Sequence, residues 1–375
     1  MVTADDGRRI TEEQYIREQG SAPLKNNLIR KIVRNVLGVF RNNYSIPQFD
    51  ELPGVNDDAS NAMSPHPENL SELYSRTIRD NCMSEIFSRV LEEYLIGGLA
   101  VLRKRFSLEG GGKVITEMVR PDSFFFNTDA VDPRGLDIHT IGEIHEVKNF
   151  EPVSPGGKVI EIWRLEGNGW RYYFLDETGN IITQGDSPFP SRSHPYVMKA
   201  YPFIDGEIHS FVADCIDQQR YINRLITLND WIIRASAKGV LLFPENAIPD
   251  DLELEDIADQ WARYNGVIRY KAKTGMPLPQ QVSTNSTNVG ISELLEVQLK
   301  MMEDVSGINA ALQGQLTSGA ISGTLYAQQT RHALTGLSDI LEGYRVFMTE
   351  SSLKDIEFLQ LTSPPPTPPR KERGA

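Results

Sequence analysis

The sequence predicts an α+β fold, in which long helices and short strands occupy separate stretches of the chain. Two observations carry this prediction. Apolar residues recur at helical spacing in residues 22–43, 70–95, 207–238 and 288–305. Between residues 99 and 184, short alternating runs are instead separated by glycine-rich turns. At 375 residues the chain is long enough for two or three packed units.

The first 205 residues begin with helices and continue with strands. Residues 22–43 predict a basic amphipathic helix, and because a solvated face accounts for its charges we assign it no site. Residues 44–69, rich in Pro, Asn and Asp, predict a loop before a helix over 70–95 that ends at Gly97-Gly98. Strands are then expected over residues 99–107, 113–119, 159–165, 170–176 and 180–184.

One group of residues in this region offers zinc-ligand chemistry. If residues 138–147 form a strand, His139, Glu143 and His145 share a face, and two imidazoles with a carboxylate are plausible zinc ligands. However, apolar residues recur there at every third position, which favours a helix that would spread the three side chains around it. The other four histidines lack the context of nucleophilic catalysis, and no phosphate-loop, dinucleotide, Gly-x-Ser-x-Gly or His-Glu-x-x-His motif is present. The sequence therefore predicts no metal, no cofactor and no enzymatic activity.

Residues 207–238 predict a long amphipathic helix, whose mixed charged face suits a neighbouring subunit or water. Strand-like runs at 239–244 and 267–271 follow, around a short acidic helix-like piece. This insert is too small to bury much core alone, so we expect it to need a partner or neighbouring copies. Interleaved aromatic and cationic residues predict a docking surface there, although core packing explains Trp261 equally well. The surface consists of Trp261, Arg263, Tyr264, Arg269, Lys271 and Lys273.

A second helix over residues 288–305 and an uncharged, glycine-rich loop over 306–323 complete this region.

The net charge of −13 and the pI near 5.1 argue against a generally basic nucleic-acid binder. No apolar run approaches the roughly 20 residues of a membrane span, and Cys82 and Cys215 are too few for a disulfide framework. We therefore expect no membrane partner and assembly in a reducing cytoplasm.

Over residues 20–360 the sequence resembles the portal, or head–tail connector, proteins of tailed bacteriophages. The resemblance rests on residues 217–223 (DQQRYIN), 305–308 (VSGI), 312–314 (LQG) and 317–319 (TSG), in this order and separation. It implies a portal-like fold with the following parts: an α/β wing over 1–205, a stem hairpin of helices 206–238 and 288–305, a small α/β clip at 239–287, a tunnel loop at 306–323 and a long wing helix at 324–361. Family members often continue into a helical crown. Here residues 362–375 predict a proline-rich, basic, disordered tail, so we expect the crown to be absent or truncated.

The resemblance implies a subunit of a homo-oligomeric ring, commonly a dodecamer, at one capsid vertex of the virion. The ring would form the channel for packaging and ejection of double-stranded DNA. It would dock terminase, then head-completion or adaptor proteins, within a shell of major capsid or scaffolding protein. An acidic wall would keep DNA from adhering, while rings of cations steady its backbone, with Arg220, Arg224, Arg234 and Lys238 as candidates. Candidates for the moving loop are Asn309, Gln313, Gln315, Thr317 and Ser318. The alternative is a non-viral oligomeric interaction scaffold with a helical hairpin and a proline-rich recruiting tail.

Overall fold

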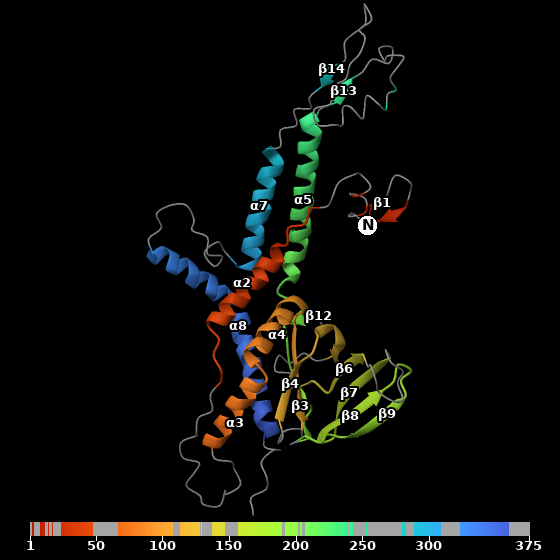
Figure 1. The fold of residues 1–375 in the computed structure, drawn as a ribbon, viewed down its shortest axis with the longest axis vertical. Helices are drawn as coiled ribbons and strands as arrows, with labels where there is room; N and C mark the ends of the chain where they lie inside the picture. The colour runs from red at the N-terminus through yellow and green to blue at the C-terminus, as the bar shows by residue number, and fades with distance from the viewer. Residues whose placement is uncertain are drawn as a thin grey trace, which may run out of the picture. The chain divides into compact units, whose positions relative to one another are not determined.

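The chain combines long helices with antiparallel sheets (Figure 1) and divides into two units, one of Asn27–Ile216 with Glu303–Ala375 and one of Met1–Asn26 with Asp217–Met302. This mixture confirms the α+β prediction. The computed structural model describes residues 2–3, 8–11, 14, 17, 24–47, 67–107, 113–127, 129, 137–146, 157–189, 192–201, 203–204, 207–238, 240–242, 253, 255, 280–282, 289–308 and 323–359.

Two antiparallel sheets form the centre of the unit Asn27–Ile216 and Glu303–Ala375. In the first sheet, β3 (Leu99–Ser107) lies between β10 (Tyr196–Ala200) and β4 (Lys113–Met118). After the short helix η1 (Pro121–Ser123), a five-stranded meander runs in sequence order: β5 (Phe124–Phe126), β6 (Thr140–Glu146), β7 (Lys158–Glu166), β8 (Gly169–Leu175) and β9 (Ile181–Asp186). Both sheets contribute to one buried core, which contains Leu99, Val101, Val119, Phe124, Ile141, Trp163 and Tyr196.

The predicted strands of this region are confirmed, but the preference for a helix over residues 138–147 is wrong. β6 pairs along its length with β7 and at one end with β5, so it is an inner strand of the meander. Gly142 permits this close approach, because a Cβ atom at that position would collide with the Phe125 ring and the backbone carbonyl of Glu161. Pairing on both edges therefore outweighs the three-residue spacing of the isoleucines.

Three helices of the same unit meet at the buried Tyr344. They are α2 (Leu28–Asn42), α4 (Met83–Gly97) and α8 (Gly323–Leu359). The Tyr344 ring lies 5.5 Å from that of Phe40 on α2 and 5.9 Å from that of Tyr94 on α4. Its hydroxyl donates a hydrogen bond of 2.5 Å to the backbone carbonyl of Phe87, so the fully buried phenol has a partner.

The single helix predicted over residues 70–95 is instead two helices, α3 (Pro67–Asp80) and α4. The break lies at Asn81 and Cys82, and Cys82 has a left-handed backbone with a φ of +50°. The Asn81 amide donates to the carbonyl of Val114 at 2.8 Å, and its oxygen accepts from the amide of Thr116 at 2.9 Å. Asn81 thus bonds the free edge of β4, which a residue inside a continuous helix would not reach. The predicted stop at Gly97-Gly98 is confirmed, because Gly98 is left-handed and caps α4.

The other unit contains most of α5 (Ala213–Lys238) and of α7 (Val289–Ser306). β13 (Val240–Leu242) directly follows α5 and pairs antiparallel with β14 (Gln280–Val282), which precedes α7. This pairing returns the chain as a helical hairpin. The N-terminal strands β1 (Val2–Thr3) and β2 (Arg9–Ile10) also pair.

α5 begins six residues later than the predicted start at 207. Residues 207–208 instead form β12 (Glu207–Ile208), which pairs with β11 (Phe203–Ile204). The wing, stem and clip boundaries remain predictions, although helices occupy the expected stretches before 239, after 288 and after 323. None of the described helices has both the length and the apolar character needed to cross a membrane.

Candidate functional site

The four channel candidates lie on α5, and two of them have described side chains. Arg220 and Arg224 are both exposed, and their spacing of four residues places them on one face of the helix. The guanidinium of Arg220 donates to Asp217 on the same helix at 3.1 Å, with the two side chains 77% and 91% exposed. Its charge is therefore partly balanced within α5. The side chains of Arg234 and Lys238 lie outside the described part of the structure.

The residues 217–223 that carry the portal resemblance also hold the N-terminal segment. Gln219 donates a hydrogen bond of 2.5 Å to the backbone carbonyl of Asn26, and the amide of Asn26 donates to the Asn223 oxygen at 3.0 Å. Gln219 also donates to Asn223 at 3.1 Å. Gln219 and Asn223 therefore hold the backbone of Asn26 against one side of α5. Their spacing in the sequence does not reveal this role.

The remaining site predictions fall outside the described residues. These are the docking-surface residues Trp261, Arg263, Tyr264, Arg269, Lys271 and Lys273, and the loop residues Asn309, Gln313, Gln315, Thr317 and Ser318. They stay predictions.

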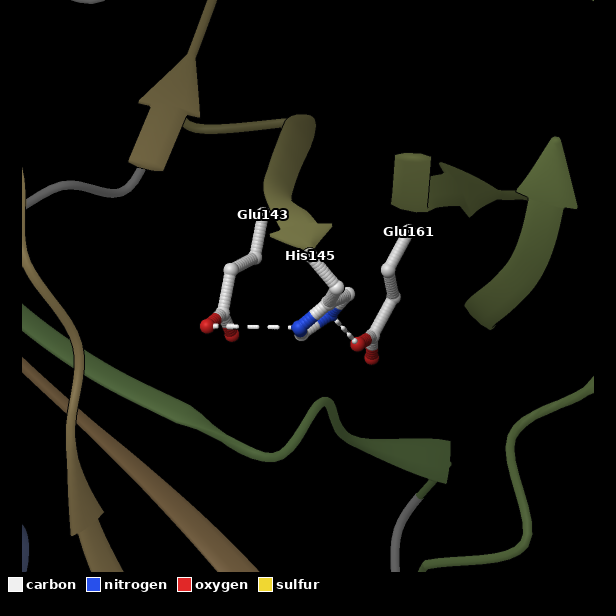
Figure 2. A group of neighbouring side chains, drawn as sticks. All are labelled: Glu143, His145 and Glu161. Carbon is white, nitrogen blue, oxygen red and sulfur yellow. Dashed lines mark hydrogen bonds and ion pairs between the residues drawn. The ribbon is translucent and has the colours of Figure 1, made fainter. Parts of the chain in front are cut away.

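A network of ionic side chains joins the two sheets of the larger unit. Figure 2 shows the His145 imidazole between the carboxylates of Glu143 and Glu161, with ring nitrogens 3.5 and 2.7 Å from the respective oxygens. Arg103 on β3 reaches the same carboxylates at 3.3 and 3.6 Å and forms a shorter pair of 2.7 Å with Glu117 on β4. We call these five residues the inter-sheet ionic cluster. It connects β3 and β4 of one sheet to β6 and β7 of the other.

Neutral partners complete the cluster. The Trp163 indole donates to Glu161 at 2.6 Å, and the Tyr196 hydroxyl donates to Glu143 at 3.0 Å. Burial raises the pKa of Glu143, and the charge of Arg103 only partly opposes this shift. Burial also acts to raise the pKa of Glu161, but hydrogen bonds from His145 and Trp163 outweigh it and leave the pKa lowered. The ionised form of Glu161 is therefore stabilised more than the ionised form of Glu143.

The cluster has the donor atoms for a metal ion, but the guanidinium of Arg103 already supplies a positive charge there. One ligand atom from each of Glu143, His145 and Glu161 lies within 4.8 Å of the others. A divalent ion such as Zn²⁺ accepts this donor set. Arg103, however, already compensates both carboxylates, so a second cation would be repelled in a poorly solvated site. The geometry therefore favours a structural ion-pair network over a metal centre.

The residues of this cluster differ from the three that the sequence predicted as possible zinc ligands. Glu143 and His145 share a face of β6, as a strand requires, whereas His139 precedes the strand and lies 3.5 Å from Asp129. The missing members come from other strands, because Glu161 is the register partner of Glu143 across β6 and β7. Two carboxylates opposite one another need a nearby cation. Aligning residues 140–146 with 158–166 as paired strands would have signalled this, but the isolated segment could not.

The comparison with protein families agrees with the resemblance in sequence. A family model described as phage P22-like portal protein matches residues 142–352, more than half of the chain. No curated protein matches. Among solved structures, the chain is similar to one titled as the virion of a native gene transfer agent particle, with 13% identity and a TM-score of 0.42 over 82% of this chain and 71% of that chain. The family match includes most of the second sheet, the helical hairpin and most of α8, and because it covers more than half of the chain, the chain belongs to the family of P22-like phage portal proteins.

Proposed function

We propose that the chain is the subunit of a ring-shaped portal, placed at one capsid vertex of a phage virion. The ring would form the channel through which double-stranded DNA is packaged and later ejected. Membership of the portal family supports the general role. The observation that carries ring formation is an exposed apolar stripe on α7.

Four apolar side chains lie along one face of α7 at spacings of three, four and four residues. Leu294, Val297, Met301 and Val305 are 37, 52, 43 and 48% exposed. In contrast, Met302, on an adjacent face, is only 2% exposed. A continuous apolar stripe of this kind marks a protein contact. A neighbouring subunit of the ring is the partner we propose, since head-to-tail contacts between identical chains close into rings.

The charge of the chain suits a channel that binds the DNA passing through it only weakly. The net charge is −13, and the exposed Arg220 is paired with Asp217. DNA binding strengthens with the number of phosphates that cations neutralise. Sparse, partly paired cations would therefore steady the duplex without stopping its movement. We assign this role to Arg220, Arg224, Arg234 and Lys238, and the moving contact to the loop over residues 306–323.

We further propose that the chain performs no catalysis. ATP hydrolysis would belong to a terminase docked at residues 239–287, which head-completion or adaptor proteins later replace. Contacts with the major capsid or scaffolding protein would seat the ring during assembly in the host cytoplasm.

Single-particle imaging of the purified chain tests this proposal directly. We expect cone-shaped rings, commonly of twelve subunits in this family, with an axial hole wide enough for duplex DNA. A monomer or a closed dimer at high protein concentration would overturn it and favour an interaction scaffold instead.

A further inference from the structure

A cavity of about 630 Å³ lies beside the inter-sheet ionic cluster. Its wall is mainly aromatic and apolar, with Phe106, Val159, Trp163, Phe174, Phe189 and Pro195 among its residues. The volume is typical of a binding pocket. The polar side chains of the wall already have partners: His145 binds Glu161 at 2.7 Å, Arg103 and Arg105 bind Glu117, and Lys104 binds Asp355. Apolar contact is therefore the main interaction that this cavity offers.

The last turn of α8 ends at the wall of this cavity. Phe358, which is fully buried, stacks on Phe189 with ring centroids 4.6 Å apart. Phe106 and Phe189 both pack against the buried cluster that contains Phe358 and Leu359. Since these two phenylalanines also line the cavity, the chain leaves α8 at the edge of the cavity.

The residues that follow α8 have the composition of an aromatic-groove ligand. Residues 361–369 read LTSPPPTPP and contain Leu361 and five prolines. Proline runs adopt the extended polyproline helix, which is already ordered and docks on aromatic walls at low entropic cost. The five Cα-to-Cα steps from Leu359 to Pro364 span up to about 17 Å when extended, enough for the first proline to reach the cavity from its edge.

We propose that the cavity binds residues 361–369 of the same chain, with the prolines packed on the wall formed by Trp163, Phe174 and Phe189. Covalent attachment at the cavity edge gives this segment a high effective concentration, so it outcompetes free ligands of similar composition. The segment thereby covers apolar surface that the sheets leave open.

Cysteine reactivity in the full chain tests the proposal. Cys82 is exposed and Cys215 is buried, so Cys82→Ser removes the accessible native thiol. In that background we compare maleimide labelling of Thr367→Cys with labelling of Ala375→Cys, which lies beyond the prolines. We expect the thiol at position 367 to react at least tenfold more slowly. Phe174→Ala should abolish this difference, whereas Ile181→Ala, a 54% exposed residue on β9 that does not line the cavity, should preserve it.

A second variant keeps the test independent of folding defects in the sheet. Pro365→Ser with Pro368→Ser alters only the segment, and it too should bring the two labelling rates together. Equal rates in the unaltered segment, or protection that survives Phe174→Ala in a folded protein, overturn the proposal. Protection from labelling that is lost when the protein is diluted also overturns the proposal, because the cavity would then bind the segment of another copy of the chain. Imaging reports ring formation separately, so this outcome leaves the portal proposal unaffected.

Discussion

Lys104 and Asp355 form a buried ion pair that ties β3 to the last turns of α8. The Lys104 Nζ atom lies 2.7 Å from Asp355 Oδ1, and the side chains are 0 and 2% exposed. Nζ also donates to the hydroxyl of Thr116 at 2.9 Å. Burial lowers the pKa of Lys104 and raises that of Asp355, and their attraction opposes both shifts only in part. The pair therefore holds the last turns of α8 against β3, beside the aromatic cavity.

Removing one partner of this pair should destabilise the chain strongly. Lys104→Met leaves the Asp355 carboxylate buried without its cation, which typically costs about 3–5 kcal/mol. The double variant Lys104→Met with Asp355→Leu should recover most of this loss, since it leaves no buried charge. Urea unfolding measures both. As a control, Arg76→Ala breaks the exposed pair with Asp80 and should change stability by less than about 1 kcal/mol. Equal costs for the single and double variants would contradict the assignment.

We expect the chain to retain no stoichiometric zinc. The guanidinium of Arg103 lies 3.3 and 3.6 Å from the carboxylates that a metal would need. Arg103→Met should therefore increase zinc affinity at least tenfold while lowering stability, and His145→Asn added to it should remove the gain. Isothermal titration with zinc chloride measures the affinities. Tight zinc binding by the unaltered chain that His145→Asn abolishes would instead revive the metal-centre hypothesis.

His194 should make the chain less stable at acidic pH. Burial, with a smaller contribution from the charge of Lys354, lowers its pKa from 6.5 to about 3. The backbone amide of Tyr196 donates to Nδ1 at 3.3 Å, which requires that nitrogen to be unprotonated. Below pH 6.5 the unfolded chain therefore binds the proton that the folded chain excludes, and stability falls as the pH falls. The loss from this group between pH 6.5 and 5 is about 2 kcal/mol.

The test for this loss compares unfolding by urea at the two pH values. His194→Gln should lose about 2 kcal/mol less than the unaltered chain over this interval, whereas His139→Gln, on an exposed segment, should lose as much as the unaltered chain. An unchanged pH slope in His194→Gln would show that other groups cause the acid sensitivity.

Local pattern was sufficient to predict elements whose residues need few distant contacts. The turns between β7, β8 and β9 contain Gly167 and Gly179, both with positive φ, and the glycine-rich sequence identified both turns. α7 was predicted to within one residue at each end, because long amphipathic periodicity is a strong signal.

The failures occur where a distant segment decides the local structure. Asn81 ends α3 because β4 presents unpaired backbone groups to it, and the helical pattern of residues 70–95 contains no sign of that strand. For the same reason, only two of the five residues of the ionic cluster were predicted. Glu143 and His145 are two residues apart, but Arg103 lies 40 residues away from Glu143 in the chain, and no spacing rule connects them.

Charges placed on the exposed stripe of α7 should prevent ring formation without unfolding the chain. Leu294→Glu with Val297→Glu puts two carboxylates where a neighbouring subunit would bury apolar side chains, and burying an unpaired charge is strongly unfavourable. We expect the fraction of chains in rings, measured by mass photometry, to fall at least tenfold. Leu353→Glu is the matched control, since Leu353 is 57% exposed but lies on α8, outside the stripe. Circular dichroism should be unchanged in all three proteins, because none of these side chains is buried in the single chain. Rings that persist in the double variant would show that α7 is not the contact between subunits, even if the chain is a portal.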